Sequence, residues 1–223
     1  MNRFNAFSAL SIFLFSGCLE ERLFPPFESL SLLESEVQIE YGEEYQLSVE
    51  FSESFPSQVY WKSKDESIVE VNNSGLLIAI RAGTTVVSAS SMDYSNTPEC
   101  LVTVHPTNFL FQEPSIKFNS TKEVIKRNET RTLSSEGENQ LVYRGENDHV
   151  RSILYTFDKG SLVTAVVFLR SNFTSREDVI DFLEQRYSRE EYSSENIWYK
   201  GERYHALYLE DGSLGMRVMY QGR

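Results

Sequence analysis

The sequence is poor in the residues that metal sites and many catalytic sites require. It has three histidines, His105, His149 and His205, which lie 44 and 56 residues apart, so no pair has the short spacing of a helical or hairpin zinc site. It lacks the Gly-x-Ser-x-Gly nucleophile motif, a phosphate-binding glycine loop and the dinucleotide-binding fingerprint. Acidic residues are numerous, but no spacing marks a catalytic pair. We therefore expect a protein that is not an enzyme and that binds neither a metal nor a cofactor.

Basic residues are also in deficit. The 223 residues include 21 Lys and Arg against 33 Asp and Glu, a formal net charge of −12. Nucleic-acid binding requires a basic surface, so we expect no nucleic-acid partner. The length corresponds to about two domains of roughly 100 residues each.

The amino terminus predicts an export signal. Arg3 is followed by a mostly apolar run over residues 4–14 and then by Phe15-Ser16-Gly17-Cys18. This is the order of a secretory signal peptide, and the run is shorter than the roughly 18 residues that a membrane-spanning helix needs. Residues 15–18, Phe-Ser-Gly-Cys, resemble the lipobox of bacterial lipoproteins, although the first position usually holds an aliphatic residue. The alternatives are a transmembrane helix or a cleaved signal with an incidental cysteine.

The lipobox resemblance implies how the protein is anchored. It implies that residues 1–17 are removed and that Cys18 carries lipid, with residues 18–26 as a tether to the first domain. The acidic pair Glu20-Glu21 is similar to the surface-export signal of Bacteroidota lipoproteins, which implies the outer membrane or cell surface; inner-leaflet retention is the alternative. A lipidated Cys18 leaves Cys100 as the remaining thiol, so no intrachain disulfide can form. Cys100 shares a strand face with Val102 and Val104, and we interpret it as a small buried hydrophobe.

Residues 27–105 read as an all-β sandwich. Apolar and polar residues alternate in about seven short segments, separated by Gly and Asn turns. These segments are residues 37–39, 45–51, 59–61, 68–71, 76–80, 85–89 and 101–104.

Six motifs at this spacing resemble the group 2 bacterial immunoglobulin-like domains. They are Tyr41-Gly42-Glu43 followed by Leu47, and then residues 61–65, 68–71, 72–76, 82–87 and 100–104. The resemblance implies that Trp61 fills the sandwich core and that Gly75 and Gly83 adopt positive φ at turns. Members of this family occur as spacers and adhesive modules on bacterial surface proteins.

Residues 107–223 predict an α+β domain with an internal repeat, about 115–169 and 170–221. Capping boxes at residues 120–123 and 174–177 mark two helix starts. Each is followed by one strand and then by a hairpin, with turns at Gly160 and Gly212. We expect two units of one helix and three strands that form an antiparallel sheet with both helices on one face. This pattern resembles the duplicated β-lactamase-inhibitor-protein-like fold, from which no activity can be transferred.

The aromatic residues of the second repeat are the candidate binding residues. Trp198, Tyr204 and Tyr208 fall on predicted strands, as do Tyr199 and Tyr220. A sheet covered by helices on one side leaves the other side free for a protein or glycan ligand. Alternatively, these rings fill the core. The sequence thus predicts a lipid-anchored, non-enzymatic surface protein whose immunoglobulin-like spacer presents a C-terminal binding domain; a glycan-binding accessory of a polysaccharide-uptake system and a cryptic enzyme are the alternatives.

Overall fold

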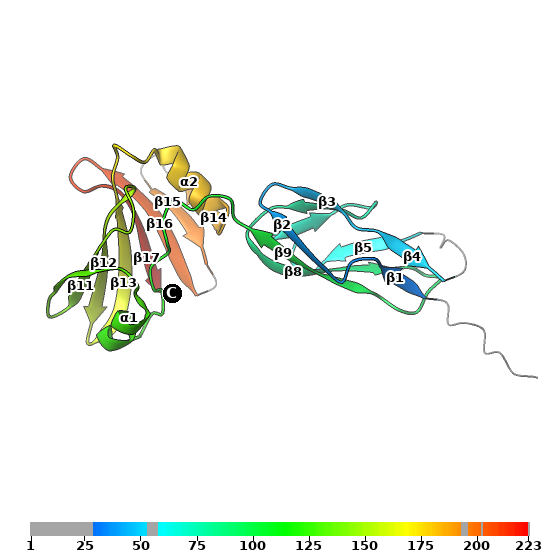
Figure 1. Ribbon diagram of the computed structural model, residues 1–223, viewed down its shortest axis with the longest axis horizontal. Helices are drawn as coiled ribbons and strands as arrows, with labels where there is room; N and C mark the ends of the chain where they lie inside the picture. Colours follow the sequence, from blue (N-terminus) through cyan, green and yellow to red (C-terminus); the bar gives the residue numbers. More distant parts are fainter. Residues whose placement is uncertain (1–28, 53–57, 193–195, 202, 223) are drawn as a thin grey trace, which may run out of the picture.

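Two β-rich parts follow each other along the chain, a sandwich and a large sheet with two short helices (Figure 1). The computed structural model describes residues 29–52, 58–192, 196–201 and 203–222. The predicted signal peptide, Cys18 and the tether lie outside the described residues.

The first part consists of nine short strands. Four form one sheet in the order β2-β9-β8-β5, three form a second in the order β3-β7-β6, and β1 pairs with β4. The pairing of β2 with β9 is parallel, and the other described pairs are antiparallel. The strands are β1 (Leu30–Leu32), β2 (Glu36–Glu40), β3 (Glu44–Gln46), β4 (Val49–Phe51), β5 (Tyr60–Ser63), β6 (Val69–Val71), β7 (Leu76–Ala79), β8 (Gly83–Ser90) and β9 (Glu99–His105).

Alternate residues of these strands form the sandwich core. The cluster comprises Val37, Ile39, Leu47, Val69, Leu77, Ala79, Val87, Cys100, Val102 and Val104. Cys100 has no exposed surface, which confirms its interpretation as a buried hydrophobe, and burial raises the pKa of its thiol. The single strand predicted over 45–51 is divided, because Leu47 turns into the core and its N–H donates to the Gly75 carbonyl at 3.0 Å.

Trp61 and Gly75 fit together at one point of the sandwich. The Trp61 side chain is half-buried and packs against two apolar clusters. Gly75 has a φ of +84°, as predicted, and a Cβ built on it would lie 2.5 Å from the Trp61 ring. Gly83 also has a positive φ, of +153°. Glycine at position 75 therefore satisfies both the backbone conformation and the close approach of the ring.

The second part is one eight-stranded antiparallel sheet. The strand order is β10-β11-β12-β13-β17-β16-β15-β14, and helices α1 and α2 precede β10 and β14 in the chain. Four strands follow each helix, so the predicted unit of one helix and three strands is wrong. The elements are α1 (Lys122–Asn128), β10 (Leu133–Glu136), β11 (Gln140–Arg144), β12 (Val150–Asp158), β13 (Ser161–Leu169), α2 (Arg176–Glu184), β14 (Ser188–Tyr192), β15 (Asn196–Lys200), β16 (Tyr204–Asp211) and β17 (Gly215–Gly222).

The helix starts differ from the predicted capping boxes. Helix α1 has Thr121 as its N-cap, with no side-chain capping hydrogen bond. Helix α2 has a complete capping box, but it joins Ser175 and Asp178, one residue later than predicted. The hairpin at Gly160 has the positive φ expected there, whereas in the second hairpin the positive φ falls on Gly215 and not on Gly212.

One core joins the two helices to the sheet. Ile125 of α1 and Val179, Phe182 and Leu183 of α2 belong to the same buried cluster as alternate residues of the strands. We call this side of the sheet the covered face and the other the open face.

A buried ion network fixes the segment before α1 to this core, because Arg131 donates to Glu129, to Glu146 and to the Gln112 carbonyl.

Gln185, directly after α2, connects the two parts. Its carbonyl accepts a hydrogen bond from the Ala82 N–H of the sandwich at 2.7 Å. Its Oε1 accepts from the N–H groups of Thr107 and Asn108 in the connecting segment, at 2.8 and 3.0 Å. Because Gln185 is only 2% exposed, these bonds are shielded from water and hold the sandwich against the end of α2.

Candidate functional site

The open face presents three rows of side chains across six strands. The pairing registers place directly neighbouring residues of β11, β12, β13, β17, β16 and β15 in each row. The middle row is apolar: Val142, Leu154, Val166, Met219, Leu207 and Trp198. The flanking rows are Gln140, Thr156, Thr164, Gln221, His205 and Lys200 on one side, and Arg144, Ser152, Phe168, Arg217, Leu209 and Asn196 on the other.

These three rows contain no acidic residue. They carry Arg144, Arg217 and Lys200, although the whole chain has 33 acidic against 21 basic residues. Arg217 forms an ion pair with Asp211, whose carboxylate lies 2.6 Å from it at the end of the sheet. Arg151, beside the third row, stacks over the Phe168 ring at 5.0 Å. The open face therefore combines an apolar centre with basic groups in an acidic protein.

The apolar row is separate from the protein core. Val166 and Leu207 are 8% and 5% exposed, yet neither belongs to the core clusters, because both point to the open face. Their half-buried neighbours, among them Leu154 and Met219, shield them. The row is thus a shallow apolar strip between two rows in which ten of the twelve side chains are polar or charged, with Phe168 and Leu209 as the exceptions. An apolar centre with a polar rim is the composition of a protein interface.

The predicted aromatic residues fall on different faces. Trp198 lies on the open face, half-buried, with its ring edge-on to His205 at 5.7 Å. Tyr208 is fully buried on the covered face and donates to Glu210 at 2.6 Å, so its assignment as an exposed binding residue is wrong. Tyr199 and Tyr220 are fully buried on the same face. Tyr204 is half-buried against the core, where its hydroxyl donates to that of Tyr187 at 3.1 Å.

The buried tyrosines surround a carboxyl group. The hydroxyls of Tyr187 and Tyr220 donate to Oε1 of Glu113, and burial raises the pKa of Glu113. Burial and the nearby Glu113 charge hold the pKa of the Tyr220 phenol well above its ordinary value. These groups fix residues 107–115 to the covered face, and we assign them a structural role.

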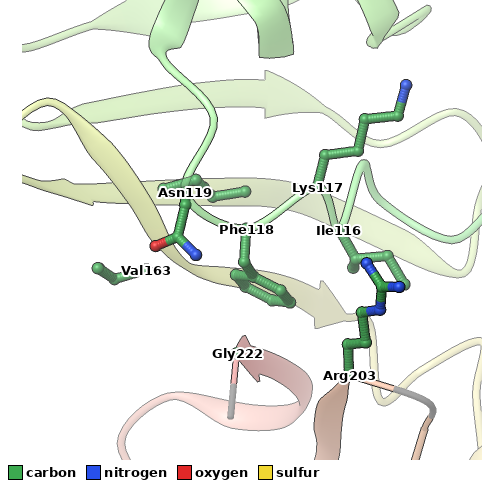
Figure 2. A pocket seen from close by; sticks show the side chains of 8 residues that line it. Ile116, Lys117, Phe118, Asn119, Val163, Arg203 and Gly222 are labelled. Carbon is green, nitrogen blue, oxygen red and sulfur yellow. The ribbon is translucent and has the colours of Figure 1, made fainter.

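A groove of about 860 Å³ lies at one end of the sheet (Figure 2). Phe118 points toward Gly222, and a Cβ on that glycine would lie 3.2 Å from the Phe118 ring. The Arg203 guanidinium points toward Ile116, whereas Lys117 points away from the groove (Figure 2). The residues lining the groove include no Asp, Glu, His or Cys.

The described residues contain neither a cluster of metal ligands nor a helix that could cross a membrane. Within the ranges that the structure covers, no group of three or more His, Cys, Asp or Glu side chains could hold a metal ion. No helix among these residues is both long enough and apolar enough to cross a membrane.

Some solved structures show distant similarity. The chain is 17% identical to an intimin mutant of EHEC O157:H7, over 49% of this chain and 58% of intimin, with a TM-score of 0.25. It is 11% identical to domains 5–6 of the S-layer protein SbsC, over 88% and 84% of the two chains, with a TM-score of 0.31. It is 16% identical to SGBP-B of the Bacteroides ovatus mixed-linkage glucan utilization locus, over 83% of this chain and 42% of SGBP-B, with a TM-score of 0.29. TM-scores this low carry no inference about function.

The sequence of the first part matches a known family. No curated protein matches the chain. Residues 26–102, however, match the sequence profile described as Bacterial Ig-like domain (group 2). The sandwich observed over the described residues of this range agrees with that match, as do the positions of Trp61 and Gly75. Residues 26–102 are therefore a group 2 bacterial immunoglobulin-like domain.

Proposed function

We propose that this protein is a non-enzymatic bacterial surface protein whose large sheet binds a protein partner through its open face. The observation that supports this most is the continuous row of six apolar side chains on the open face, between two rows that contain no Asp or Glu. Glu190 of the edge strand β14 lies beside this surface, where it contacts Lys200 and His205. A glycan platform would require several coplanar exposed rings, but Tyr199, Tyr208 and Tyr220 are buried on the covered face. The open-face rows hold two aromatic residues, Trp198 and Phe168, which lie in different rows and on strands that are not neighbours. Apolar centres with Trp, Met and Arg are typical of protein interfaces.

The immunoglobulin-like domain serves as a spacer in this proposal. Group 2 domains occur on bacterial surface proteins, and the N-terminal sequence predicts an export signal followed by a lipid on Cys18. Figure 1 places β1, where the described chain begins, at the end of the sandwich remote from the large sheet. A chain anchored at its amino terminus would therefore hold the sheet about one domain length from the membrane. Surface placement and the lipid anchor are parts of the proposal.

Photocrosslinking on intact cells tests the binding face. A photoreactive amino acid replaces Thr164 in the centre of the open face, and in a matched protein it replaces the exposed Glu177 on α2. We expect a crosslinked protein of defined mass from position 164 and none from position 177. Equal crosslinking at both positions, or none at 164, would refute the proposal.

Substitutions then measure the contribution of the face to affinity. With the crosslinked partner purified, Trp198→Ala and Met219→Arg should weaken binding at least tenfold in surface plasmon resonance, as loss of an interface anchor does. Both variants should keep the wild-type circular dichroism spectrum, because neither side chain belongs to the core cluster. Tyr208→Ala, in contrast, should destabilise the fold by about 3–5 kcal/mol.

A further inference from the structure

A second cleft lies between the two parts of the protein. It has a volume of about 630 Å³ and is lined by residues 65, 67–68 and 81–84 of the sandwich and by residues 186–188, 200–201 and 204 of the second part. Small-ligand sites commonly have volumes of about 300–1,000 Å³ and often lie between domains. The contact of Ala82 with Gln185 closes one side of the boundary, so both walls of the cleft are held in place.

The cleft concentrates positive charge. Arg81, Arg186 and Lys200 line it, together with a single acidic residue, Asp65. Lys200 has a side chain that is 53% exposed and lies 3.7 Å from Glu190. In a chain of net charge −12, three basic side chains in one cleft create a local field that attracts anions.

The two arginines are held by neutral groups. Arg81 donates to the hydroxyls of Ser67 and Ser188, one from each part of the protein. Arg186 donates to the carbonyls of Phe182 and Asn108, at 3.0 and 2.7 Å. Within the described part of the chain, neither arginine forms an ion pair with a carboxylate. Hydroxyl and carbonyl oxygens therefore orient both guanidinium groups.

Two carboxyl groups act on Arg186 without a direct hydrogen bond. Glu113 accepts from the hydroxyls of Tyr187 and Tyr220 and not from Arg186. Desolvation lowers the pKa of Arg186, while the charges of Glu113 and Asp181 oppose that effect. A partly desolvated cation is costly, and an anionic ligand beside it would offset part of that cost.

We propose that this cleft binds a sugar that carries a carboxylate group, with the carboxylate held by Arg186, Lys200 and Arg81. The volume of the cleft exceeds that of a single inorganic oxyanion. The hydroxyls of Thr84 and Ser188 contact Thr103 and Arg81, and each hydroxyl can make further hydrogen bonds of the kind that a polyhydroxylated ring requires. This cleft adjoins the edge of the open face and shares Lys200 with it, and ligand binding there does not require the proposed protein partner.

Isothermal titration calorimetry of the full chain tests the proposal with three probes: digalacturonate, neutral cellobiose and sodium sulfate. Digalacturonate should bind, with an affinity that falls as salt concentration rises, whereas cellobiose should not bind. Sulfate should bind at least tenfold more weakly than digalacturonate. Sulfate binding as tight as that of digalacturonate would overturn the assignment of a sugar, and absence of digalacturonate binding would overturn the site.

A matched pair of variants locates the binding. Lys200→Gln should weaken digalacturonate binding about tenfold or more, the loss expected for one charge-assisted hydrogen bond. Lys62→Gln makes the same charge change at an exposed position of β5 outside the cleft and should leave affinity unchanged. Arg186→Lys keeps the charge but loses the planar fork, and should also weaken binding in a protein with an unchanged melting temperature. Equal affinities for the Lys200 and Lys62 variants would place the ligand elsewhere and overturn the proposal.

Discussion

The contact between Trp61 and Gly75 allows a quantitative test of packing in the sandwich. A Cβ at position 75 would meet the ring at 2.5 Å, and the backbone there has a φ of +84°. Gly75→Ala thus adds the cost of a side chain in left-handed backbone, about 1–2 kcal/mol, to an overpacking cost of about 1–3 kcal/mol. The sum is about 2–5 kcal/mol. Gly42 is a matched control, because its φ is +80° and no atom lies within 4 Å of the added Cβ, so Gly42→Ala should cost about 1–2 kcal/mol.

Removing the ring should remove most of the difference. In a Trp61→Ala background, Gly75→Ala should cost only the backbone contribution of about 1–2 kcal/mol, while the cost of Gly42→Ala should not change. The assay is urea unfolding, followed by the rate at which a thiol reagent labels Cys100. Cys100 has no exposed surface in the folded sandwich, so labelling reports unfolding, and this signal does not depend on Trp61 fluorescence. A Cys18→Ser background makes this label specific. Equal costs of Gly75→Ala with and without Trp61 would show that the ring does not set the constraint.

Four further results are expected. Arg131→Met should destabilise the second part by about 3–5 kcal/mol in urea unfolding, because it leaves the carboxylate of Glu129, whose side chain is 2% exposed, without its charged partner. Arg127→Met, on the exposed side of α1, should change stability little. Gln185→Ala should broaden the distribution of distances between the two parts in spin-label measurements, and an unchanged distribution would show that other contacts fix them. Hydrogen bonds from Ser175 lower the pKa of Asp178, so its charged form stabilises the fold above the unfolded pKa of 3.8, and this contribution is lost as pH falls. Asp178→Asn keeps an acceptor for Ser175 but removes the charge at the start of α2, so the stability difference between the two proteins should be about 0.3–1 kcal/mol at pH 6 and should decrease in acid. Cys18→Ser should abolish incorporation of labelled fatty acid, and persistent labelling would contradict the lipobox.

Sequence patterns identified strands that have one buried face. The hairpin of β12 and β13 and the strands around Cys100 were predictable because apolar and polar residues alternate there. The two outermost strands of the large sheet were missed. β10 reads Leu-Ser-Ser-Glu with every residue exposed, and β14 reads Ser-Arg-Glu-Glu-Tyr. Polar edge strands prevent pairing with other chains, and the same polarity removes the pattern that would identify them.

Alternation shows which residues share a face but does not show which face the helices cover. Trp198 and Tyr199 are adjacent, so they had to point to opposite sides of the sheet. Only the packing of Val179 and Phe182 against the tyrosine side decides that Tyr199 and Tyr208 lie in the core and that Trp198 lies on the open face. The cleft around Arg81 and Lys200 was not predictable, because it depends on how the two domains are placed against each other.

The parallel pairing of β2 with β9 has a mechanical consequence. The amino-terminal segment of the chain leads into the start of β2, and the end of β9 leads to the large sheet. The two strands pair in register from Glu36 with Leu101 to Glu40 with His105. A tensile load between an anchored amino terminus and a bound partner would draw these two strands in opposite directions along their axes. Their hydrogen bonds lie across that direction and would resist sliding together, whereas an antiparallel terminal pair loaded from one end would open one bond at a time. Under such a load, the parallel pairing of β2 with β9 would oppose unfolding of the domain.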